Sequence, residues 1–204
     1  MNRFFAFVIS MLSTVTVPAQ NNVQDTAGPV ATTVEDRRNK VAILPFTFLK
    51  DGEPASEEAS MEIQNECFAL FTKRPGIYSF LPTRRTDVLL HKAGITKATL
   101  INYTMDELCK VLGVQYIVDG AVSLVKTSST SYGNSNYNNK GDDNKQSSSY
   151  ATHTQNYQTT VDFKIYNDQG ETIYNQNRKA FWNMADSYKD ALEYVVKRSP
   201  LYTK

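Results

Sequence analysis

The stretch from Leu112 to Lys126 constrains the fold of this chain more than any other. Gly113 can adopt the left-handed conformation that ends a helix, so the chain is expected to turn directly from helix into strand there. From Tyr116 onward the residues are mainly β-branched or apolar, with Gly120 near the middle. Such a run is typical of a central strand that is covered on both faces.

The residues before this strand show alternating strand and helix patterns. Val41 to Phe48 predicts a buried strand, in which Pro45 removes a ladder donor and marks a strand end, a bulge or an edge. Ser56 is expected to cap a long helix, and Thr104 with Glu107 fits a capping box. The expected elements are a turn or loop at 51–54, helices at 56–74, at 83 or 86 to 94 and at 104–112, and a short strand at 77–81.

The character of the sequence changes in residues 127–160, which contain no Val, Ile, Leu, Phe or Met. We expect residues 134–149 to be a disordered or mobile loop and the flanks to extend the neighbouring strands. Three interpretations of this insert stay open: a membrane-inserting hairpin, a loop that contacts a partner protein, and a variable surface loop. The first needs alternating apolar residues over about 9–11 positions in each arm, which the insert lacks. In the second, the contact residues are Tyr132, Tyr137, Tyr150 and Tyr157.

The last part of the chain predicts a hairpin and a helix. Val161, Phe163 and Ile165 alternate with polar residues, and the turn at 167–170 ends in Gly170. Residues 171–182 are expected to form the return strand, and 184–196 an amphipathic helix that docks on the sheet. The predicted fold class is therefore α/β (α+β), with a single mixed sheet of about five strands and helices packed on it.

Residues 1–19 have the pattern of a secretory signal peptide. Arg3 is followed by an apolar run, and small residues precede a polar switch, which predicts cleavage between Ala19 and Gln20. An uncleaved membrane anchor is the alternative, but the run is shorter than the ~20 residues of a spanning helix. Residues 20–39 are expected to be a flexible leader, and 40–200 a single domain with the polar insert 127–160.

Charge and cysteine content limit the classes of function. The formal net charge of +1 falls to 0 when residues 1–19 are removed, since Arg3 is their only charged residue. A neutral chain without a basic run gives no electrostatic footprint for nucleic acid. Cys67 and Cys109 could form one disulfide in an exported protein, but each lies on the apolar face of a predicted helix, which favours buried free thiols.

The sequence contains few residues with an arrangement typical of catalysis. It has no Gly-rich phosphate loop, no nucleophile elbow and no Cys-x-x-Cys motif, and His91 and His153 stand apart from acidic partners. Asp119 could be a carboxylate with a raised pKa, but a solvent-facing strand position is favoured. Arg84 and Arg85 could bind an anion or be a solvated face. We therefore expect no enzyme, no cofactor, no metal and no small-molecule substrate.

Several segments of the chain resemble the CsgG/TolB-N-terminal-like family of bacterial envelope proteins. They are residues 40–46, 78–85 and 112–122, the late strand at 161–166 and its Gly-Glu turn at 170–171. That family includes the curli secretion channel, the N-terminal domain of TolB and lipoproteins that activate penicillin-binding proteins. The resemblance covers roughly residues 40–197 and rests on structural rather than catalytic motifs. It implies an envelope protein that acts through contacts.

Departures from the family decide between two functions. The insert is polar where the channel has its first membrane hairpin, residues 171–182 leave no room for the second, and there is no N-terminal Cys for a lipid anchor. We therefore expect a non-enzymatic periplasmic interaction module, associated with the outer membrane through its partners. Those partners would be secretion, outer-membrane or peptidoglycan-synthesis components. The alternative is a homo-oligomeric subunit of a curli-type outer-membrane channel.

Overall fold

The computed structural model describes residues 33–135 and 149–203, with the side chains of 130–154 left out of the description. Residues 31–204 form one unit by their internal contacts, and all that follows concerns this unit. The predicted signal peptide, the cleavage site at Ala19 and Gln20, the leader up to residue 32 and the middle of the insert at 136–148 lie outside the described residues.

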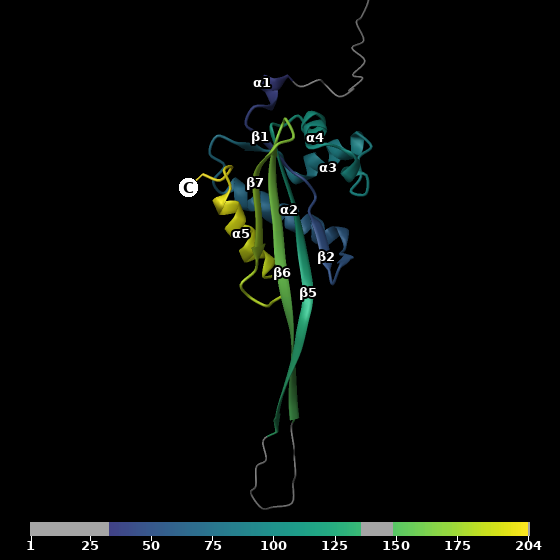
Figure 1. Cartoon of the computed structure of the whole chain (residues 1–204), viewed down its shortest axis with the longest axis vertical. Helices are drawn as coiled ribbons and strands as arrows, with labels where there is room; N and C mark the ends of the chain where they lie inside the picture. The colour runs from purple at the N-terminus through teal and green to yellow at the C-terminus, as the bar shows by residue number, and fades with distance from the viewer. Residues whose placement is uncertain (1–32, 136–148, 204) are drawn as a thin grey trace, which may run out of the picture. The chain divides into compact units, whose positions relative to one another are not determined.

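A single mixed sheet with helices on both faces confirms the predicted fold class (Figure 1). In the described part of the chain the sheet has seven strands rather than about five. The first predicted strand divides at Pro45, and two residues of the following loop pair with its second half. The strands are β1 (Lys40–Ile43), β2 (Thr47–Lys50), β3 (Glu53–Pro54), β4 (Ser79–Phe80), β5 (Tyr116–Ser135), β6 (Ser149–Asn167) and β7 (Thr172–Lys179).

Strand β5 joins the two halves of the sheet. On one side it pairs in parallel with β1 and then with β2, and β4 pairs in parallel with β1. On its other side it pairs antiparallel with β6, which pairs antiparallel with β7. The sequence stretch around Gly120 is therefore the central strand that its apolar pattern predicts.

The break between β1 and β2 brings Phe46 over Gly120. A Cβ atom at position 120 would overlap the Phe46 ring and lie 2.8 Å from the carbonyl oxygen of Asp162. Glycine is needed here because a ring and a neighbouring backbone approach the strand closely. Pro45 ends the first strand segment, as its missing N–H predicts.

Helices cover both faces of the sheet. The helical segments are α1 (Val34–Arg37), α2 (Glu57–Thr72), α3 (Thr83–Lys92), the 3-10 helix η1 (Leu100–Asn102), α4 (Met105–Leu112) and α5 (Tyr188–Arg198). One core contains α2, α5 and the β1 side chains of Val41 and Ile43. The other contains residues of α3 and α4 with Ala42 and Leu44. Alternation along β1 thus divides the interior into two layers.

Helix ends follow the signals in the sequence. The Ser56 hydroxyl accepts a hydrogen bond from the Ala59 N–H at 3.3 Å, and the Glu107 carboxylate accepts one from the Thr104 N–H at 2.9 Å. Gly113 has φ 65°, the left-handed conformation that turns α4 into β5. None of the helices in the described residues is long and apolar enough to span a bilayer.

The two cysteines are free and buried, as their places on apolar helix faces predict. Cys67 of α2 packs in one core and Cys109 of α4 in the other, so the sheet separates them. Burial raises the pKa of both thiols, that of Cys109 to about 12. Both side chains therefore act as small hydrophobic groups in the packing.

Helix α1 lies within the stretch that the sequence predicts as a leader. The Thr33 hydroxyl caps it by accepting a hydrogen bond from the Asp36 N–H at 3.3 Å. Arg37 is only 8% exposed, and its Nη2 atom lies 3.9 Å from Oδ2 of Asp168 in the β6–β7 turn. This ion pair attaches α1 to the end of the hairpin.

Candidate interaction surface at the root of the strand arm

The two central strands continue beyond the rest of the sheet. Strand β2 pairs with β5 as far as Leu124, and β7 pairs with β6 as far as Thr160. Past these residues β5 and β6 pair with each other up to Ser135 and Ser149 (Figure 1). We call residues 125–135 and 149–159 the arm. It confirms the prediction that the flanks of the insert extend the neighbouring strands.

Of the four tyrosines predicted to contact a partner, the structure describes only one with its side chain. Tyr132 and Tyr150 lie in the arm, opposite Thr152 and Asn134, and their side chains are outside the description. Tyr137 lies outside the described residues altogether. Tyr157 is half-buried where the arm leaves the sheet, opposite Lys126. A partner contact by these four residues stays a prediction.

Three large apolar side chains are exposed in the segment that joins β7 to α5, whose backbone is hydrogen-bonded to Tyr157 through Asn183. Phe181 is 79% exposed, Trp182 55% and Met184 57%. The rings of Phe181 and Trp182 meet edge to face with centroids 5.0 Å apart. We call Phe181, Trp182, Met184 and Tyr157 the root surface.

Hydrogen bonds fix the backbone of this segment. The Ala180 N–H donates to the carbonyl of Thr159 and the Tyr157 N–H to the carbonyl of Asn183, both at 2.9 Å. The Met184 N–H donates to the Ser187 hydroxyl at 3.1 Å. The apolar side chains are thus held in place by a segment attached to the edge of β6.

The boundaries predicted here were wrong, and the root surface was missed. The return strand ends at Lys179 rather than Trp182, and the last helix begins at Tyr188 rather than Met184. Ala180 is the last apolar residue that the sheet buries at this edge. Adjacent Phe181 and Trp182 cannot both face the core of a strand, and this break in alternation is the signal that could have located the surface.

A hollow of about 300 Å³ lies beside the root surface. Its charged edge comes from Glu62, whose carboxylate lies 3.5 Å from Lys189 Nζ and accepts a hydrogen bond from the Tyr188 hydroxyl at 3.3 Å. Burial, with the nearby Glu62 charge, raises the pKa of Tyr188, so the phenol stays protonated at neutral pH. The hollow is lined by Phe48, Lys50, Ala59, Glu62, Ile63, Leu124, Ala185, Asp186, Tyr188 and Lys189.

Of the residues considered for catalysis or anion binding, Arg84 and His91 line one hollow beside α3, and Asp119 and His153 lie on strands β5 and β6. Asp119 lies opposite Lys164 on β6, and burial raises its pKa against the lowering effects of the Gly120 N–H and the Lys164 charge. His91 is exposed on α3, Arg84 and Arg85 are exposed at the start of that helix, and the side chain of His153 is outside the description. Within the described part of the chain, no three His, Cys, Asp or Glu residues are grouped to hold a metal ion.

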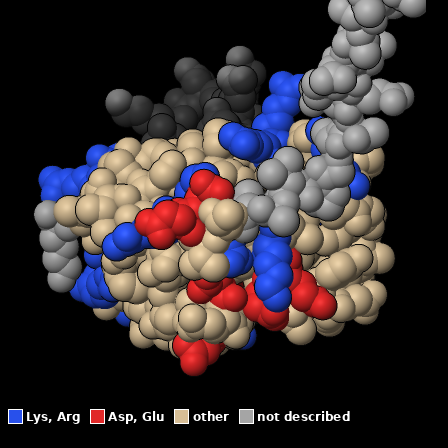
Figure 2. Space-filling model, turned by 90° about the horizontal axis from the view of Figure 1, so that it is seen from above, with Lys and Arg blue, Asp and Glu red and all other residues tan. Residues whose placement is uncertain are grey.

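Charge is mixed on the face drawn in Figure 2, where Lys and Arg side chains lie among Asp and Glu side chains. This agrees with a formal net charge of +1. This face therefore offers no broad field of one sign for the long-range attraction of a partner.

No protein-family model and no curated protein matches the sequence. Solved structures that resemble the fold include the following three. The LpoB C-terminal domain from Salmonella enterica is 11% identical with TM-score 0.39, and the alignment covers 69% of this chain and 81% of that one. Lipoprotein GNA1162 from Neisseria meningitidis is 10% identical with TM-score 0.45, covering 78% and 95%. PelC from Paraburkholderia phytofirmans, solved as a dodecamer, is 13% identical with TM-score 0.38, covering 82% and 91%.

Similarity at this level does not identify a function. The narrower resemblance to the CsgG/TolB-N-terminal-like family therefore stays a prediction from the sequence.

Proposed function

We propose that this chain is a non-enzymatic binding protein of the bacterial cell envelope, which docks another envelope protein on the root surface. The observation that carries the proposal is the exposure of Phe181, Trp182 and Met184 on a backbone segment fixed by hydrogen bonds. Aromatic residues and methionine are enriched at protein interfaces, and tryptophan is among the residues that contribute most to binding. Leaving them in water costs free energy that burial against a partner recovers.

The fixed backbone supports docking for a second reason. A partner that binds pre-positioned side chains loses less conformational entropy than one that must order a free loop. The hollow beside the root surface adds a recess into which a partner side chain can fit. The root surface thus offers exposed apolar side chains with a recess beside them.

The envelope location comes from the signal-peptide pattern of residues 1–19. In that compartment the partner would be a component of secretion, of outer-membrane assembly or of peptidoglycan synthesis. The arm favours this function over a membrane channel, because its sequence lacks the alternating apolar residues that face lipid.

Fractionation of the native host with size measurement tests this function. We expect the processed chain in osmotic-shock fluid, in a complex larger than its own monomer. The double variant Phe181→Ser/Trp182→Ser should run at monomer size, because it removes the anchors. Ile77→Ser/Ile101→Ser is the matched control, since these residues are also exposed, at 74% and 89%. Heat-stable rings in detergent extracts of the outer membrane, or a wild-type monomer, would contradict the proposal.

A further inference from the structure

A second hollow, of about 600 Å³, lies away from the root surface between α2, α3 and the segment at 95–100. Its apolar wall includes Leu90 and Ile95, which are 5% and 3% exposed. Met61 and Val88 form an open rim, at 45% and 44% exposed. The volume is in the range of ligand pockets in proteins.

The place of this hollow in the topology is typical of binding sites. After β1, β2 and β3 the chain passes through α2 to β4, which lies on one side of β1. From β4 it passes through α3 and α4 to β5, which lies on the other side of β1. Helices α2 and α3 contribute to opposite layers, and the hollow lies beside Pro45, just past the carboxyl end of β1. In α/β sheets, ligands bind outside the carboxyl ends of strands where connections diverge in this way.

A carboxylate is fixed in this hollow by a buried amide. Gln64 of α2 is 1% exposed, and its Nε2 atom donates to the Ile43 carbonyl at 2.8 Å and to Asp87 Oδ1 at 3.3 Å. Both amide hydrogens are then used, so Gln64 holds one oxygen of Asp87 in place. No hydrogen bond from the described residues reaches the other oxygen, Oδ2. Burial raises the pKa of Asp87. The Gln64 hydrogen bond acts against this, and the Glu57 charge acts in the same direction as burial.

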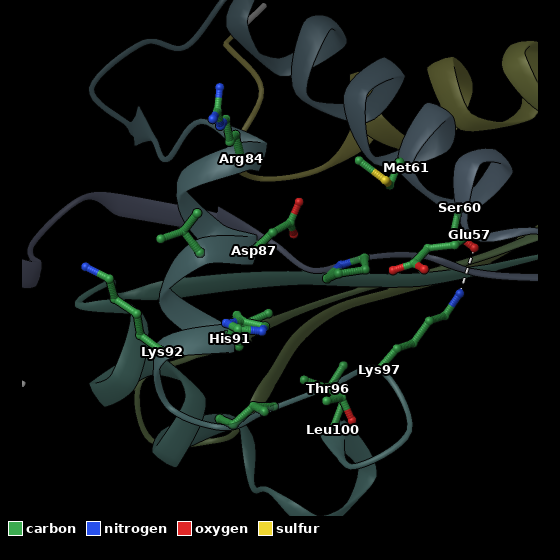
Figure 3. Close-up of a pocket in the computed structure, with 14 residues that line it drawn as sticks. Glu57, Ser60, Met61, Arg84, Asp87, His91, Lys92, Thr96, Lys97 and Leu100 are labelled. Atoms are coloured by element: carbon green, nitrogen blue, oxygen red, sulfur yellow. Dashed lines mark hydrogen bonds between the residues drawn. The ribbon is translucent and has the colours of Figure 1, made fainter.

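The cations around the hollow are not placed to neutralise Asp87. Arg84, one turn before Asp87 on α3, also lines the hollow, but its side chain points away from Asp87 (Figure 3). Lys97 reaches across to α2 and donates to the Ser60 hydroxyl at 2.6 Å, and Lys92 points away from α2. Glu57 points toward the same gap as Lys97. None of the ion pairs found in the described residues involves Asp87. The hollow therefore has an apolar wall and a fixed carboxylate without a paired cation.

We propose that this hollow binds a lysine side chain of a partner polypeptide, with the ammonium group on Asp87 Oδ2 and the alkyl stem along Leu90 and Ile95. A lysine fits better than an arginine, because Gln64 occupies Oδ1 and leaves no symmetric pair of oxygens for a two-point contact. The exposed rim of Met61 and Val88 accepts an apolar residue next to the lysine. This inference rests on the proposed function for the existence of a protein partner, but it uses residues separate from the root surface.

NMR titration of the purified processed chain, observing the Met61 methyl group, tests this assignment. The probe is the blocked peptide acetyl-Leu-Lys-Leu-amide, and acetyl-Leu-Gln-Leu-amide is its uncharged control. We expect the lysine peptide to shift the Met61 signal and to bind about tenfold more tightly than the control, as one charge-assisted hydrogen bond implies. Asp87→Asn should remove that preference, while Glu58→Gln, an exposed α2 variant outside the hollow, should keep it.

Equal binding of the two peptides, no shift at Met61, or an unchanged preference in Asp87→Asn overturns the assignment. Circular dichroism of each variant shows whether it is folded, and Asp87→Glu should retain part of the preference. The two proposals fail separately. A peptide that does not bind leaves docking on the root surface intact, and loss of the complex in the Phe181→Ser/Trp182→Ser variant leaves peptide binding in the hollow intact.

Discussion

Asp119 sits within β5, on the sheet face opposite to Val118, with Lys164 across the strand pair. Partial removal from water makes its ionised form less favourable than in the unfolded chain, and the Gly120 N–H and the Lys164 charge offset this in part. The pKa in the folded state is therefore above that in the unfolded state. The residue therefore contributes to the pH dependence of stability.

The raised pKa of Asp119 predicts a pH dependence of stability. The folded state keeps the proton at pH values where the unfolded state has lost it, so the free energy of unfolding falls as pH rises above about 3.9. The decrease levels off above the folded-state pKa. In Asp119→Asn this contribution is absent, so the free energy of unfolding by urea, measured between pH 4 and pH 7, should fall less or rise more with pH than in the wild type.

The exposed variant Glu53→Gln should keep the wild-type slope and serves as the control. A slope in Asp119→Asn equal to that of the wild type would mean that burial does not perturb this carboxyl.

At this scale the sequence located some residues and missed others. The roles of three residues at helix and strand ends were predictable, because each acts through its own backbone preference or through a hydrogen bond to a near neighbour. These residues are Gly113, Pro45 and Ser56. The root surface was missed: the break in alternation at Phe181 and Trp182 marks the end of the strand, but the exposure of the two side chains also depends on where the sheet and the helices end around them. The same holds for Asp87, whose setting depends on Gln64, a residue of another helix.

Among the elements, α1 shows how one ion pair positions a segment. Four residues cannot form a stable helix alone, since nucleation is costly and most helical stability comes from packing. Arg37 supplies that packing by burying its side chain against the end of the hairpin, where Asp168 faces it. The sequence could not show this, because the two residues are far apart in the chain.

Removal of the Asp168 charge should destabilise the fold. Asp168→Asn leaves the buried Arg37 guanidinium without its acid, which we expect to cost on the order of 2 kcal/mol of unfolding free energy. Arg37→Met/Asp168→Asn should lose less than the sum of the two single variants, because the unpaired charge is gone. Denaturant unfolding of the four proteins measures this. Additive losses would show that the two side chains do not interact.

For the whole molecule, β5 connects three functions of the fold. One edge of β5 pairs with β1 and then β2 in the α/β half, its other edge pairs with β6 in the hairpin half from Tyr116 onward, and its end forms the arm with β6. The sequence predicted the first two from hydrophobic periodicity. The length of the arm was less predictable, because polar residues such as Ser and Thr are compatible with both a strand and a loop. The binding role rests on the surface where the arm meets the segment before α5.

Site-specific photocrosslinking in native cells tests that role most directly. A photoreactive phenylalanine at position 182 should give one discrete crosslinked product, and the same residue at position 101, also highly exposed, should not. Adding Phe181→Ser and Met184→Ser to the position-182 protein should remove the product, since the neighbouring anchors are lost. Absence of a product at position 182, or equal products at both positions, would contradict docking on the root surface.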